Sequence, residues 1–72
     1  MASPLQLLRV DVITAATEAE GSRAPEDIQD RLAFALGRLG TAAWQGSDVQ
    51  RATAIAGAAM AAWTSWKADA NG

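Results

Sequence analysis

The chain has 72 residues, eight acidic against six basic side chains, a net charge of −2 and a pI of about 4.7. It contains no His, Cys or Tyr. These absences exclude disulfides, thiolate nucleophiles, histidine-based triads and the usual zinc ligands. The composition therefore predicts a single domain, residues 1–72, stabilised by a small hydrophobic core without covalent help.

The distribution of charged and apolar residues argues against nucleic-acid and membrane partners. The arginines are scattered along the chain, whereas nucleic-acid binding needs concentrated positive charge. The longest run without charge, residues 52–66, is shorter than the roughly 20 residues that span a bilayer. The segment Met1–Leu5 lacks the basic start of a signal peptide, so we expect a cytoplasmic protein.

The first predicted helix covers residues 4–20. Ser3 and Gln6 have capping-box spacing, and Pro4 suits the first helical position. Gly21 is expected to end the helix. The apolar face contains Leu5, Leu8, Val12, Ala15, Ala16 and Ala19. The residues around Val12 also have strand propensity, so a short strand is the alternative.

The second predicted helix covers residues 25–45. Pro25 opens it, and acidic residues follow in the first turn, where they favour the positive end of the helix dipole. Its apolar stripe contains Ile28, Leu32, Ala35, Leu36, Leu39, Ala42 and Ala43. Internal glycines weaken a helix by about 1 kcal/mol each, so a break near Gly40 is the alternative.

The third predicted helix covers residues 48–69. Gly46 ends the preceding helix, and Ser47 with Gln50 repeats the capping-box spacing. Residues 70–72 are expected to fray. Three helices of similar length joined by short turns predict an all-α fold, a small antiparallel three-helix bundle.

The helices carry more apolar surface than a monomer of this size needs. Leu7, Val10 and Phe34 lie outside the main stripes, although three tryptophans are expected to act as core anchors. Small residues also line faces of the second and third helices that carry no charge. We therefore expect a homodimer. Its predicted seam consists of Ala33, Gly37, Gly40, Trp44, Ala54, Gly57, Ala58 and Ala61.

Phe34, flanked by Asp30 and Arg38, is the candidate protein-binding patch, because interaction hot spots are apolar residues surrounded by polar ones. We expect a non-enzymatic interaction module, an adaptor or inhibitor such as phages and mobile elements encode, that docks a preformed helical surface on a protein partner. The alternative is a self-assembling structural subunit.

The carboxylates lie near helix starts and turns, where solvated surface charge is the usual state. No calcium loop or glycine-rich phosphate loop is present in the sequence. We expect no catalytic residue, no metal and no cofactor.

The chain resembles two known families, one in a short segment and the other in its size and acidity. Trp44-Gln45-Gly46 resembles the turn of the small secreted WxG-type proteins, which implies an exported helical hairpin; those proteins have longer helices and a Tyr-containing secretion motif. Size and acidity are similar to acyl carrier proteins, which carry a prosthetic arm on a Ser within Asp-Ser-Leu. Here Ser47 stands within Gly-Ser-Asp instead.

Overall fold

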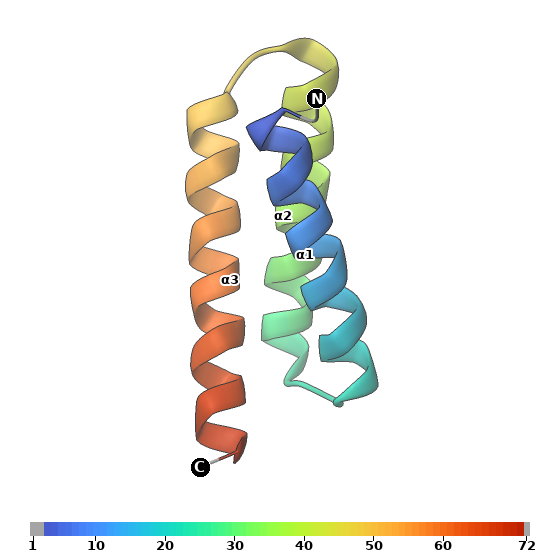
Figure 1. The fold of residues 1–72 in the computed structure, drawn as a ribbon, viewed down its shortest axis with the longest axis vertical. Helices are drawn as coiled ribbons and strands as arrows, with labels where there is room; N and C mark the ends of the chain where they lie inside the picture. Colours follow the sequence, from blue (N-terminus) through green and yellow to red (C-terminus); the bar gives the residue numbers. More distant parts are fainter. Residues whose placement is uncertain (1–2, 72) are drawn as a thin grey trace.

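The computed structural model describes residues 3–71 and consists of three helices: α1 (Pro4–Gly21), α2 (Glu26–Gln45) and α3 (Val49–Asn71) (Figure 1). Each helix packs against the other two. The connection from α1 to α2 lies at the lower end in Figure 1 and that from α2 to α3 at the upper end. Residues 3–71 contain no strand, so the predicted all-α bundle is confirmed and the strand alternative near Val12 is excluded.

The start of α1 forms as predicted. The Gln6 backbone N–H donates to Ser3 Oγ at 3.2 Å, and the Ser3 N–H donates to Gln6 Oε1 at 3.0 Å. This reciprocal pair satisfies two backbone donors that the first helical turn leaves without partners. The part of the signal-peptide argument that concerns Met1 and Ala2 lies outside the described residues.

The end of α1 differs from the prediction. The helix continues through Gly21, and the Ser22 N–H donates to Glu18 O at 2.9 Å. The left-handed residue is Arg23, with φ of 56°. This late reversal lets Ala24 donate to Ala19 O at 2.9 Å and enter the core at 5% exposure. Burial of Ala24 therefore decides where the helix ends, and Arg23 carries the backbone strain that a glycine would avoid.

The second helix is unbroken from Glu26 to Gln45, so the alternative of a break near Gly40 is wrong. Gly46 ends it as predicted, with φ of 66° and an N–H that donates to Ala42 O at 2.8 Å. The continuous apolar stripe of α2 explains the result, because burial along it outweighs the weak helix propensity of Gly37 and Gly40.

The third helix begins at Val49 rather than Asp48 and extends to Asn71, two residues beyond the prediction. Asp48 adopts a left-handed φ of 55°. The Ser47 hydroxyl donates to Gln45 Oε1 at 3.4 Å instead of capping the helix, so the predicted second capping box is wrong. The tight reversal after Gly46 turns Ser47 back towards α2. Gly72, also predicted to fray, lies outside the described residues.

The core is built largely from alanine. Its buried members are Val12, Ala15, Ala19, Ala24, Ile28, Leu32, Ala35, Leu39, Ala42, Ala52, Ala56, Ala59 and Trp63. The predicted stripes of α1 and α2 face this core, with the exception of Ala43, which is exposed at the end of α2. Because alanine has almost no side chain, the helices can approach closely and need few large residues between them.

The three tryptophans have different environments, and Trp44, a member of the predicted seam, lies outside the core. Trp63 is 2% exposed, and its ring stacks on that of Trp66 with centroids 5.6 Å apart. Trp44 is 89% exposed. It follows the buried Ala42 by two positions, which places it about 200° around the helix and away from the core.

None of the helices in the described part of the chain has both the length and the apolar character needed to cross a membrane.

The contrast between the two tryptophans gives a direct test of the core. Trp63→Ala removes a buried ring and should lower the free energy of unfolding by about 3–5 kcal/mol, whereas Trp44→Ala should change it by about 0.5 kcal/mol or less. Urea unfolding followed by circular dichroism measures both. Similar losses in the two variants would contradict this packing.

Glycine substitutions test the backbone. A Cβ at Gly57 meets no atom within 4 Å, so Gly57→Ala should stabilise α3 by about 0.5–1 kcal/mol. Gly46 has the same open space but a positive φ, so Gly46→Ala should destabilise by about 1–2 kcal/mol. Thermal unfolding of the pair compares them, and a stabilised Gly46→Ala would show that the left-handed turn is absent.

Candidate interaction surface

Large apolar side chains remain exposed on every helix. The members exposed by more than two-fifths are Leu7, Val10, Ile13, Phe34, Trp44 and Val49. In a chain this small they form a substantial part of the surface. Scattered single residues of this kind are ordinary on soluble proteins, so their grouping decides whether they mark a binding site.

Phe34 lies on the outer side of α2 between the two charged residues that the sequence paired with it. Its side chain is 50% exposed. Asp30 and Arg38 are exposed one helical turn before and after it, a spacing that places all three on one ridge of the helix. The Arg38 guanidinium carbon lies 5.3 Å from the Phe34 ring centroid. This cation–π contact is worth about 0.5–1 kcal/mol at an exposed site and favours the conformation in which the two side chains lie together.

Two hollows adjoin Phe34. One, of about 390 Å³, lies along α2 and is lined by Phe34, Gly37, Arg38 and Thr41. The other, of about 170 Å³, lies between α2 and α3 and is lined by Arg31, Phe34, Ile55, Ala58 and Ala59. We call the residues that line these two hollows the Phe34 surface. Phe34 is the ridge common to both hollows, so a partner can contact the ring from two sides.

The junction with α3 is the feature that sequence analysis missed. The predictions assigned Phe34 and Ala58 to separate surfaces, whereas both line the same hollow. Ile55 of α3 also lines this hollow and is half-buried. The hollow depends on the rotation of α3 against α2, which cannot be read from either helix alone.

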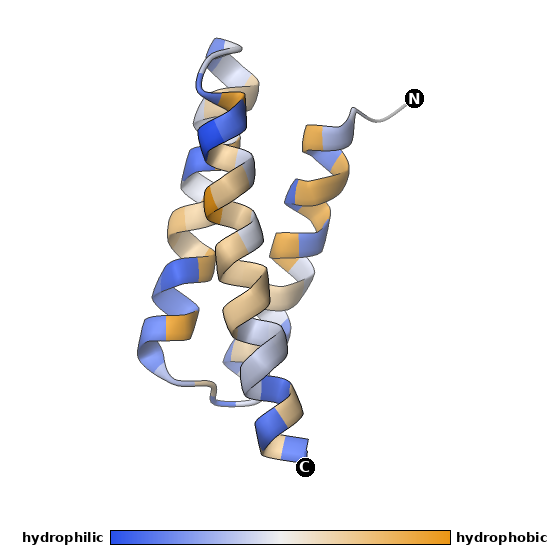
Figure 2. Ribbon diagram, turned by 90° about the vertical axis from the view of Figure 1, so that its left-hand side faces the viewer, coloured by the Kyte–Doolittle hydropathy of each residue, from blue (hydrophilic) through white to orange (hydrophobic). Residues whose placement is uncertain are grey.

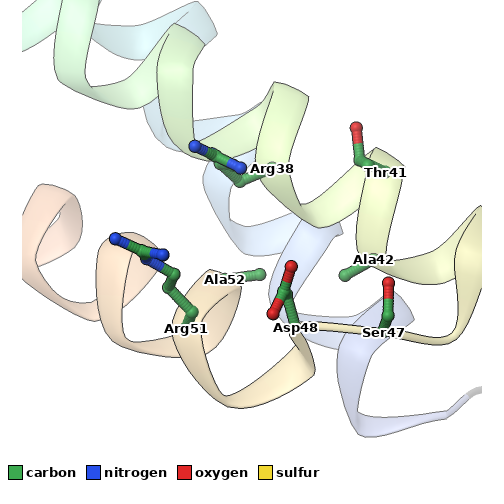
Figure 3. Close-up of a pocket in the computed structure, with 7 residues that line it drawn as sticks. All are labelled: Arg38, Thr41, Ala42, Ser47, Asp48, Arg51 and Ala52. Carbon is green, nitrogen blue, oxygen red and sulfur yellow. The ribbon is translucent and has the colours of Figure 1, made fainter.

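A smaller hollow next to the α2–α3 turn adds a second arginine. Figure 3 shows the guanidinium groups of Arg38 and Arg51 extending from α2 and α3 in the same direction, away from the turn. The hollow measures only about 10 Å³ and is lined also by Thr41, Ser47 and Asp48, among others. This is about the space of one water molecule. It therefore suits tight packing of the turn rather than an organic ligand.

The predicted dimer seam lies on the outside of the molecule. Its members are Ala33, Gly37, Gly40, Trp44, Ala54, Gly57, Ala58 and Ala61, of which Gly40 is half-buried and the others exposed. A Cβ at Gly37, Gly40 or Gly57 would meet no atom within 4 Å. These glycines therefore do not serve close packing inside the bundle. Only Gly37 and Ala58 line the Phe34 surface, and Trp44 lines neither of its hollows.

A separate group of exposed apolar residues lies on α1, whose ribbon carries several orange bands in Figure 2. Leu7 and Val10 are each 58% exposed, as their positions outside the main stripe indicated, and Ile13 joins them. The hydroxyls of Thr14 and Thr17 donate to Val10 O and Ile13 O, each at 3.0 Å. The threonines therefore turn their polar groups back to the helix, and this group stays largely apolar.

The ionisable groups are dispersed. In the described part of the chain, no three acidic residues lie close enough to hold a metal ion. A fourth hollow, about 240 Å³, lies between α1 and α3 and is lined by residues that include Asp11, Glu18, Trp63 and Lys67. Lys67 Nζ lies 4.0 Å from Glu18 Oε2 and 5.1 Å from the Trp63 ring centroid. Glu18 of α1 and Lys67 of α3 therefore form an ion pair between the two helices.

Comparison of the chain with protein-family models, with curated proteins and with solved structures finds no match.

The exposed position of Phe34 has a measurable consequence. Phe34→Ala should lower the free energy of unfolding by about 1 kcal/mol or less, because half of the ring already faces water. Leu32, two residues earlier, is fully buried, and Leu32→Ala should cost about 2–5 kcal/mol. Chemical unfolding of both variants makes the comparison. A larger loss for Phe34→Ala would assign Phe34 to the core.

Proposed function

We propose that the chain is a non-enzymatic protein–protein interaction module that binds a protein partner through the Phe34 surface. The observation that carries the proposal is the half-exposed Phe34 ring standing between two hollows. Hot spots are typically large side chains near the centre of an interface, surrounded by residues that exclude water. Phe34 has that central position, and Asp30 and Arg38 lie on either side of it along α2.

The rigidity of the surface favours this function. The ring and the Arg38 guanidinium are already in contact, and the hollows lie on helices rather than loops. A preformed surface loses little conformational entropy on binding, so more of the contact energy remains as affinity. Apolar side chains of a partner would enter the hollows, and the charged residues beside them would select the partner. An adaptor or an inhibitor acts in this way.

The finer features of the fold prediction belong to the same proposal. We propose an antiparallel bundle, which the short connections at opposite ends of α2 support.

The cytoplasmic location, the absence of a nucleic-acid or membrane partner and the phage or mobile-element origin stay predictions. The exported WxG-type alternative rests on Trp44 standing just before the turn at Gly46.

Self-assembly is the second candidate function, because the predicted Ala/Gly seam is accessible. Gly37 and Gly57 have open space outside their helices, which would let helices of another copy approach closely. In this alternative the homodimer is itself the functional unit, and its subunits meet through the seam rather than through Phe34.

Affinity capture tests the first candidate. The wild-type chain, Phe34→Ala and Ile13→Ala are immobilised and exposed to a lysate of the organism that encodes the chain. Ile13→Ala is the matched control, because it removes an exposed apolar side chain from α1. We expect proteins that bind the wild type and Ile13→Ala but are reduced roughly tenfold or more with Phe34→Ala. Capture indifferent to Phe34 would refute the proposed site.

A further inference from the structure

We propose that a second copy of this chain occupies the Phe34 surface, with a two-fold axis at Phe34 and the two α2 helices running in opposite directions. The inference rests on the proposed function in one respect, that the Phe34 surface binds protein. The inference goes further in two ways: it names a second copy of the chain as one partner, and it specifies how the two α2 helices are aligned.

The charge pattern around Phe34 is complementary to itself. Asp30 lies four residues before Phe34 and Arg38 four residues after it. A two-fold axis perpendicular to α2 at Phe34 places each residue opposite the one equally far on the other side. Asp30 of one copy then faces Arg38 of the other, and the symmetry forms the same contact a second time. Parallel helices would instead place Asp30 against Asp30 and Arg38 against Arg38.

The neighbouring positions are compatible with the same register. Arg31 and Gly37 lie on opposite sides of Phe34, since Arg31 lines the hollow towards α3 and Gly37 lines the hollow along α2. A Cβ at Gly37 would meet no atom within 4 Å. This open space, part of the 390 Å³ hollow beside Phe34, leaves room for a side chain of the second copy. Both rings would meet at the axis, where paired aromatic residues are favourable.

The two charged groups are available for such contacts. Within residues 3–71, the one ion pair joins Lys67 to Glu18, so neither Asp30 nor Arg38 is paired inside its own chain. The Arg38 guanidinium carbon lies 5.3 Å from the Phe34 ring centroid. A guanidinium group has five N–H donors, so Arg38 can donate to a carboxylate while it contacts the ring.

Charge reversal tests the register. Asp30→Arg places two arginines opposite each other, and Arg38→Asp places two aspartates opposite each other. Each variant alone should dimerise roughly tenfold or more weakly than the wild type. In an equimolar mixture of the two variants, a mixed dimer has opposite charges at both contacts, whereas each variant paired with itself has like charges at both. We therefore expect the mixture to form the mixed dimer. Light scattering after gel filtration, over a wide concentration range, measures the masses, and native mass spectrometry identifies the mixed species.

Two controls separate register from general effects. Asp27→Arg changes the net charge as Asp30→Arg does, but Asp27 lies about two turns from Phe34 and off the ridge formed by Asp30, Phe34 and Arg38; this variant should still dimerise. Circular dichroism melting checks that every variant folds. The double variant Asp30→Arg/Arg38→Asp reverses both partners together and should dimerise like the wild type.

The outcomes distinguish this inference from the proposed function. A wild-type monomer at all concentrations, or a dimer that tolerates Asp30→Arg and Arg38→Asp, overturns the proposed dimer. A mixture that forms no mixed dimer overturns it as well. If Phe34-dependent capture of another protein persists in any of these cases, the proposed function stands. If capture ignores Phe34 while the mixed dimer forms, the dimer stands and the heterologous partner is rejected.

Discussion

The close, alanine-lined packing of the three helices is the constraint on which the rest of the structure depends. Within residues 3–71, the large side chains that are fully buried are Trp63, Leu32, Leu39 and Val12. Helices separated mainly by alanine leave little interior volume, so the core cannot accept further bulky residues without separating the helices. Phe34, Leu7 and Trp44 lie on helix faces that point away from this interior, so their side chains stay exposed.

The same packing creates the Phe34 surface. Ala58 and Ala59 of α3 have too little side chain to fill the groove beside Phe34, so a hollow remains between the two helices. Larger residues at these positions would cover the ring and remove the site. Small side chains thus have two effects in this chain: inside the bundle they bring the helices together, and at its border they leave one aromatic ring accessible from two sides.

Sequence signals within one helix predicted the three helices well, but they could not predict how the helices pack against one another. The Ser3–Gln6 capping box and the apolar periodicity of α2 depend on residues within one helix, and both formed as predicted. The end of α1 did not, because burial of Ala24 in the shared core moved the left-handed turn from Gly21 to Arg23. The hollow joining Phe34 to Ala58 depends on the rotation of α3 against α2, which only the packed structure defines.

The two proposed occupants of the Phe34 surface, a second copy and another protein, would link two binding equilibria. When the second copy covers Phe34, a heterologous partner that needs the ring can bind only the monomer. Each occupant then lowers the apparent affinity of the other by mass action. Raising the concentration of the chain would favour the dimer and withdraw the surface, and a tight partner would dissolve the dimer. In the proposed dimer each copy contributes one Asp30 and one Arg38, and the two-fold axis would form the same contact twice around the two Phe34 rings.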